Sequence, residues 1–191
     1  MEMDSEEKIR AFLALPLAEA FEVSVRPLMG KLKAQFPEVK WVDPSQIHLT
    51  LHFFGDIGLR GVEKISRVIP PLVQTAKPVH LLLRGVGGFP NYSQPRIIWA
   101  GIEGEVEPLA LFHSKLESEL KQAGFICEKR DFKPHLTLGR VREGKKAAPV
   151  KNILLGPTDP KQVSEIILYK SILTPAGPQY EKLQTFPLSA A

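Results

Sequence analysis

Hydrophobic and polar residues alternate in two short stretches of this chain that share one sequence. HLTL occurs at residues 48–51 and again at 135–138, with leucine at every second position. This period of two is typical of a β-strand with one face turned toward a core. The histidine and threonine of each stretch then share the opposite face. The pattern predicts two strands that each present His-x-Thr.

The rest of the pattern predicts short strands between amphipathic helices. Apolar residues recur at three- and four-residue spacing, which is typical of a helix with one buried face, over 17–36, 59–74 and 105–123. Pro27 is expected to kink the first helix and Pro37 to end it. Further strands are predicted at 9–15, 79–83, 96–102, 163–171 and 180–188, with the HLTL strands at 47–54 and 135–141. The glycine-rich segment 85–90 lacks the GxGxxG spacing of a dinucleotide loop and predicts a bulge or sharp bend.

The same order of elements occurs twice. A strand, a helix, an extended piece and an HLTL strand follow one another over residues 10–53 and again over 96–140. Arg10 precedes His48 by 48 − 10 = 38 residues, and Arg96 precedes His135 by 135 − 96 = 39. The matching offsets indicate an internal duplication, and duplicated halves usually pack about a pseudo-twofold axis. Such an axis would bring the two histidines together.

Composition narrows the class of protein. The 191 residues fit a single domain of two lobes, preceded by a flexible polar leader at 1–8. One cysteine, Cys127, excludes an intrachain disulfide, and no signal peptide or membrane span is evident, so a cytoplasmic protein is expected. The net charge of +4 only slightly favours a polyanionic partner.

Two histidines on opposite sides of a phosphorus atom suit acid–base catalysis. One imidazole can take a proton from water while the other protonates the departing oxygen, because both forms exist near neutral pH. Thr50 and Thr137 could donate hydrogen bonds to phosphate oxygens. His48 and His135 are therefore the candidate catalytic residues, and the mechanism needs neither a metal nor a cofactor.

The sequence provides less support for structural or zinc-binding roles of these histidines. A single histidine on a strand is more often structural than catalytic, and the repeat is what reverses this. His48 and His52 lie too far apart along a strand to chelate zinc easily, and no carboxylate or cysteine follows at ligand spacing. His52 is expected on the face of His48, either at the edge of the site or solvated. His80 and His113 are expected to be structural or exposed.

Arg140 could hold a phosphate, but strand parity places it on the face away from His135 unless Gly139 marks a bulge.

A basic group around the second motif could guide an RNA backbone or form a solvated loop. It comprises Lys129, Arg130, Lys133, Arg142, Lys145 and Lys146. Four aromatic residues near strand ends could stack on bases or pack in the core; they are Phe89, Tyr92, Phe132 and Tyr180.

The two motifs resemble those of the 2H phosphoesterases, and more specifically the RNA 2′,3′-cyclic phosphodiesterases first described as 2′-5′ RNA ligases. The resemblance extends to RAFLAL at 10–15, GVGGFP at 85–90, PRIIWAG at 95–101, FKPHLTLGR at 132–140 and SILTPAGPQYE at 171–181. It covers nearly the whole chain.

The resemblance implies an α+β fold in which two antiparallel sheets flanked by helices form a central cleft, with pseudo-twofold symmetry. It implies hydrolysis of an RNA terminal 2′,3′-cyclic phosphate to a 2′-phosphate, with His48 as general acid and His135 as general base, and reversible 2′-5′ ligation as a side activity. Thr50, Thr137 and Arg140 match phosphate-binding positions. The expected partner is an RNA end, with tRNA fragments as one source, or a cyclic nucleotide, bound by a monomer.

Two alternatives stay open. One is a non-catalytic module that binds RNA or nucleotides. The other keeps the chemistry but acts on a small substrate such as ADP-ribose 1″,2″-cyclic phosphate.

Overall fold

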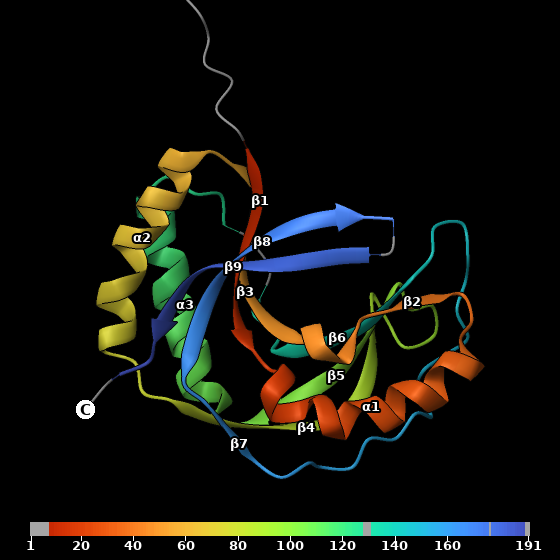
Figure 1. Cartoon of the computed structure of the whole chain (residues 1–191). Coiled ribbons are helices and arrows are strands. Elements are labelled where there is room, and N and C mark those ends of the chain that lie inside the picture. The colour runs from red at the N-terminus through yellow and green to blue at the C-terminus, as the bar shows by residue number, and fades with distance from the viewer. Residues whose placement is uncertain (1–7, 128–130, 176, 190–191) are drawn as a thin grey trace, which may run out of the picture.

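The computed structural model describes residues 8–127, 131–175 and 177–189, so most of the expected leader at 1–8 lies outside the described residues. Three α-helices and nine strands follow one another along these parts of the chain (Figure 1). Their order is β1 (Ile9–Pro16), α1 (Ala18–Gln35), β2 (Val39–Trp41), β3 (His48–Ile57), α2 (Leu59–Gln74), β4 (Val79–Phe89), β5 (Ile97–Gly104), α3 (Val106–Gln122), β6 (His135–Val141), β7 (Lys161–Val163), β8 (Glu165–Thr174) and β9 (Gly177–Pro187).

The strands form two sheets, and all pairings are antiparallel. One sheet has the order β3-β1-β8-β9 and the other the order β2-β6-β5-β4-β7. In each sheet the motif strand, β3 or β6, pairs with the strand that begins its duplicated unit, β1 or β5. The predicted α+β class with two antiparallel sheets is confirmed.

One core joins the two sheets. The leucines of both HLTL stretches belong to a single hydrophobic cluster, together with Phe21 and Val25 of α1, Ile65 of α2 and Leu116 of α3. Each buried leucine contributes about 1.5–3 kcal/mol to folding. Because the leucines point into this core, His48 and Thr50 of one sheet, and His135 and Thr137 of the other, lie on the opposite side of their strands. We call these two surfaces the motif faces.

The three helices lie close to their predicted bounds, with Pro27 inside α1. The helices α2 and α3 lie side by side along one flank of the molecule, and α1 lies apart from them (Figure 1). No helix in the described parts of the chain is long and apolar enough to span a membrane.

The glycine-rich segment 85–90 differs in part from its prediction. Most of it belongs to β4, which continues to Phe89, and the expected bulge occurs at Gly85, whose φ is +71°. Gly87 has another role, because a Cβ atom there would lie 2.1 Å from Cζ2 of Trp99. The missing side chain of Gly87 therefore makes room for the Trp99 indole.

Candidate active site

A main-chain carbonyl group two residues earlier orients the imidazole ring of His48. His48 begins β3, one residue after a short 3₁₀ turn over Pro44–Gln46. Asp43 caps this turn by accepting a hydrogen bond from the Ser45 amide at 2.9 Å. The turn places the Gln46 carbonyl oxygen 2.8 Å from Nδ1 of His48.

The second histidine is held in the same way. His135 begins β6, and its Nδ1 lies 2.7 Å from the carbonyl oxygen of Lys133, again two residues earlier. A carbonyl oxygen only accepts, so Nδ1 of each ring carries a hydrogen. The proton that each imidazole gains or loses is consequently the one on Nε2.

Aromatic rings surround both imidazoles. The centroid of His48 lies 4.9 Å from that of Phe12 and 5.1 Å from that of Tyr180. The centroid of His135 lies 5.0 Å from that of Phe89 and 6.4 Å from that of Trp99. Two of the aromatic residues considered from the sequence, Phe89 and Tyr180, therefore lie beside the motif histidines.

Burial sets the protonation of the groups around His48. Burial lowers the pKa of His48, the hydrogen bond to the Gln46 carbonyl opposes this, and the positive charge of Arg140 lowers the pKa further. Burial also raises the pKa of Tyr169 to about 12, with a smaller contribution from Glu165. Burial raises the pKa of Tyr180, while Arg140 and Arg10 oppose the shift. Near neutral pH the free protein thus holds a neutral imidazole beside two protonated phenols.

A bulge in β6 changes which way Arg140 points. Thr137 pairs with Trp99 but Gly139 pairs with Ile98, so Leu138 has no partner on β5. Leu138 and Gly139 are both buried, and Arg140 is exposed. The bulge shifts the alternation by one residue and puts Arg140 on the motif face. Parity alone would have placed Arg140 on the opposite face, and the bulge near Gly139 that was named as the exception is present.

A bulge at the equivalent point of β3 has the opposite effect on His52. Thr50 pairs with Ala14 and His52 with Leu13, so Leu51 has no partner on β1. Leu51 and His52 are both buried, and His52 is only 4% exposed. The expectation that His52 shares the face of His48 was wrong, because the bulge turns it toward α3. Phe53 follows the bulge as Arg140 does, and it is exposed.

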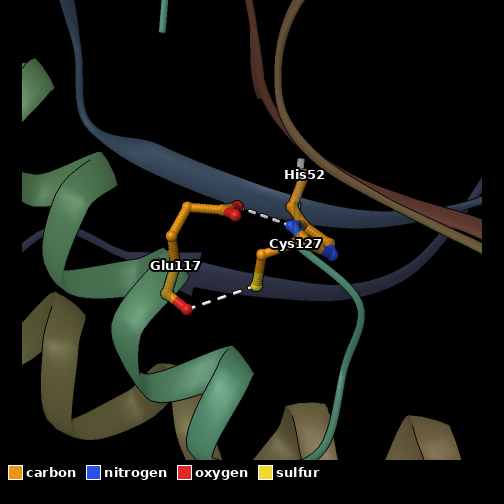
Figure 2. A group of neighbouring side chains, drawn as sticks. All are labelled: His52, Glu117 and Cys127. Atoms are coloured by element: carbon orange, nitrogen blue, oxygen red, sulfur yellow. Dashed lines mark hydrogen bonds and ion pairs between the residues drawn. The ribbon is translucent and has the colours of Figure 1, made fainter. Parts of the chain in front are cut away.

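His52 belongs to a partly buried polar group with Glu117 and Cys127, in which His52 itself is buried (Figure 2). Its Nδ1 lies 2.6 Å from Oε1 of Glu117, and the Cys127 thiol donates to the main-chain oxygen of Glu117 at 3.3 Å. Their ligand atoms lie within 4.8 Å of one another. No pattern in the sequence pointed to this group, since its members are far apart along the chain. Burial raises the pKa of Cys127 to about 11, so the thiol is protonated near neutral pH.

The remaining histidines are structural or exposed, as predicted. Nε2 of His113 donates to the carbonyl oxygen of Leu51 at 3.0 Å, which fixes the β3 bulge to α3. His113 also stacks on Phe132, with ring centroids 3.9 Å apart, so Phe132 is partly buried against the core. His80 lies on the surface beside Glu105.

The basic group expected to guide RNA is only partly described. Lys129 and Arg130 lie outside the described residues. Arg142 donates a hydrogen bond to the Pro37 carbonyl, so it stabilises the connection between α1 and β2. Tyr92 keeps 46% of its surface exposed and lies near Trp99.

The two motif faces belong to different sheets, yet they meet. Cα atoms of β3 and β6 approach within 8 Å. Arg140 of β6 lies close enough to His48 and Tyr180 of the other sheet to change their pKa values. One region of the protein thus combines two imidazoles, two threonine hydroxyls, two phenols and a guanidinium, the groups expected of a site that binds and cleaves a phosphoester.

Comparisons with known proteins agree with this class. The family model of the 2′-5′ RNA ligase superfamily matches residues 20–171. A protein of Methanothermobacter thermautotrophicus named RNA 2′,3′-cyclic phosphodiesterase is 37% identical over 95% of this chain and 100% of its own length. One of Archaeoglobus fulgidus with the same name is 36% identical over 93% and 99%.

Solved structures show the same fold. The crystal structure of a Thermus thermophilus protein, TT0787, is 30% identical, with a TM-score of 0.76 over 95% of this chain and 99% of that one. E. coli LigT complexed with 3′-AMP is similar in fold at 24% identity, with a TM-score of 0.71 over 95% and 99%. The chain belongs to the 2′-5′ RNA ligase superfamily.

Proposed function

We propose that this protein hydrolyses the 2′,3′-cyclic phosphate at the end of an RNA to a 2′-phosphate. The observation that carries the proposal is the equivalent placement of His48 and His135, each bound through Nδ1 to the carbonyl oxygen two residues earlier. The names of the relatives, RNA 2′,3′-cyclic phosphodiesterase, support the same substrate.

In the proposed reaction, His135 takes a proton from a water molecule through Nε2 as the water oxygen attacks phosphorus. His48 gives its Nε2 proton to the 3′ oxygen as the bond between phosphorus and that oxygen breaks. The products are a 2′-phosphate and a free 3′ hydroxyl, and the two imidazoles have exchanged protonation states. General acid–base catalysis of this kind contributes about 10² to 10⁴ in rate.

The lowered pKa of His48 conflicts with a role as general acid in the free protein. Burial and Arg140 favour the neutral ring in the free protein, whereas a general acid must be protonated. A bound cyclic phosphate carries a negative charge, which favours the imidazolium ion beside it. We propose that the substrate itself raises the pKa of His48 as it binds.

Three further side chains are proposed to bind the phosphate. Thr50 and Thr137 lie two residues after the histidines on the motif faces and would donate hydrogen bonds to its non-bridging oxygens. Arg140, which the bulge places on the same face, would balance its negative charge.

The proposed reaction uses only side chains of one chain, so we propose that a monomer of one domain is active and that no cofactor is needed. Its substrates would include the cyclic ends of tRNA fragments. The same chemistry, with the 5′ hydroxyl of a second RNA attacking phosphorus in place of water and the 3′ oxygen leaving, would form a 2′-5′ phosphodiester. The reverse step would cleave that linkage, which accounts for reversible 2′-5′ ligation as a side activity.

The test is to incubate an oligonucleotide that ends in a 2′,3′-cyclic phosphate with the wild-type protein, His48→Ala or His135→Ala, and to analyse the products. A metal chelator is present throughout. Wild type should give the 2′-phosphate, and each variant should lose at least 10²-fold in rate while its circular dichroism spectrum is unchanged. A 3′-phosphate product, or near-normal activity of either variant, would refute the mechanism. Binding without turnover by wild type would indicate a non-catalytic module instead. Faster turnover of ADP-ribose 1″,2″-cyclic phosphate would indicate a small substrate.

A further inference from the structure

Lys40 lies next to Arg140 at the edge of the second sheet. The short strand β2 pairs with β6 so that Lys40 is directly opposite Arg140. Side chains directly opposite each other in an antiparallel pair lie on the same face, with Cβ atoms about 4.5–5.5 Å apart. Lys40 therefore extends the motif face by one strand beyond Arg140.

The Lys40 side chain also reaches the other sheet. A Cβ atom placed on Gly177 would lie 3.5 Å from Cε of Lys40 and 3.7 Å from its Nζ. Gly177 is the first residue of β9, the strand that carries Tyr180 beside His48. The end of β8, the start of β9 and the strand β2 lie on the same side of the molecule (Figure 1). The Lys40 ammonium group is thus positioned where the two sheets approach each other.

Among the described residues, no carboxylate pairs with either of these two cations. Elsewhere on the sheets, by contrast, Lys170 pairs with Glu181 at 3.8 Å and Arg84 with Glu103 at 3.6 Å. Like charges directly opposite each other on neighbouring strands are destabilising. Two adjacent and unbalanced cations are typical of a surface that binds an anion.

We propose that Lys40 forms a subsite for the phosphodiester that joins the terminal nucleotide of the RNA to the preceding one. This inference rests on the proposed function, in which Arg140 binds the cyclic phosphate. An RNA end presents two neighbouring anions, the cyclic phosphate and this phosphodiester, and the two cations match them in number. A nucleoside cyclic phosphate presents only one. Lys40 would consequently make the enzyme prefer an RNA end over a mononucleotide.

The experiment compares two dinucleotides that both end in a 2′,3′-cyclic phosphate. One has an ordinary phosphodiester linkage and the other a methylphosphonate, which has a similar shape and no charge. Wild type should show a kcat/KM roughly tenfold higher for the charged linkage, as expected for one charge-assisted hydrogen bond. Lys40→Ala should lose most of this ratio, and Lys40→Arg should restore it because the charge is kept.

Lys161→Ala is the matched control. Lys161 is also exposed and lies on β7, the three-residue strand at the opposite edge of the same sheet. This variant should keep the wild-type ratio. The slope of log kcat/KM against log salt for the charged dinucleotide should become shallower in Lys40→Ala only.

The subsite is refuted if Lys40→Ala lowers kcat/KM equally for both dinucleotides, or if the wild-type ratio is near one. Either result would leave hydrolysis of the cyclic phosphate intact. If wild type cleaves neither dinucleotide, the proposed function itself is wrong and the subsite is refuted with it.

Discussion

Arg140, from the second motif strand, lies close enough to His48, from the first, for its charge to lower the pKa of that imidazole. The two residues are 92 positions apart (140 − 48 = 92) and belong to different sheets. This coupling shows that the motif faces form one electrostatic environment. It also makes the protonation of His48 depend on a residue that is proposed to bind substrate.

Arg140→Met should raise the pKa of His48, because the variant loses a positive charge that favours the neutral ring. The part of the kcat/KM pH profile that belongs to His48 should then move to higher pH. If His48 is the general acid, this is the alkaline side of the profile, and if it is the base, the acidic side. An NMR titration of the free protein, with His48→Gln for assignment, would measure the same shift directly.

The control for this prediction is Arg84→Met. Arg84 is exposed on β4 and pairs with Glu103. Its removal should leave the pH profile and the titration of His48 unchanged. An unchanged His48 pKa in Arg140→Met would contradict the coupling.

Thr50→Val and Thr137→Val should each lower kcat about 10²-fold, the usual effect of losing one hydrogen-bond donor to a developing negative charge. Valine has nearly the same shape as threonine, so the strands should stay folded. Steady-state kinetics on a cyclic-phosphate oligonucleotide would measure the loss. Thr75→Val is the control, because Thr75 donates only to the Leu72 carbonyl at the end of α2. If kcat is unaffected in both motif variants, the threonines do not bind the phosphate.

Glu117→Ala should destabilise the protein by about 1–3 kcal/mol, since it leaves Nδ1 of the buried His52 without its acceptor. Urea denaturation would measure the change in the free energy of unfolding. Glu117→Gln keeps an acceptor oxygen and should recover part of the loss. Glu63→Ala removes only an exposed pair with Arg67 and should change stability by less than about 1 kcal/mol. Equal effects of Glu117→Ala and Glu63→Ala would show that the buried group contributes little.

Gly87→Ala should lower both stability and kcat. The added methyl group would lie 2.1 Å from Cζ2 of Trp99, so the indole must move, and Trp99 packs near His135. Overpacking of this kind typically costs about 1–3 kcal/mol. Gly30→Ala is the matched control, because a Cβ there meets nothing within 4 Å and the residue lies inside α1. It should slightly stabilise the protein. Normal kcat in Gly87→Ala would show that His135 does not need the indole in place.

The periodic parts of the fold could be predicted from the sequence. The bounds of α2 were predicted correctly even though Pro70 and Pro71 lie in it, because its apolar stripe is long and regular. The repeated offset between Arg10 and His48 and between Arg96 and His135 reflects real equivalence, since β1 pairs with β3 and β5 with β6.

The faces of residues beyond the motifs could not be predicted in this way. Strand parity assumes strict alternation, and a bulge adds one residue that shifts it. His52 therefore lies on the face opposite to the one expected, and Arg140 lies on the motif face only because of the bulge that was named as the exception. Nothing in Leu51-His52 marks its bulge. The partly buried group of His52, Glu117 and Cys127 was also missed, because it depends on how α3 packs against β3. The short strand β2, which brings Lys40 to Arg140, has too few residues to show a period.

The two bonds from Nδ1 to a main-chain oxygen also affect how this scaffold can evolve. Gln46 and Lys133 contribute only their carbonyl groups, so the side chains at these positions can change without turning either imidazole. The rings are oriented before any substrate arrives, and little reorganisation is needed during the reaction. Residues that contact the rest of the substrate can therefore diverge while the reacting centre is preserved. A single ancestral chemistry could in this way be transferred to new phosphoesters.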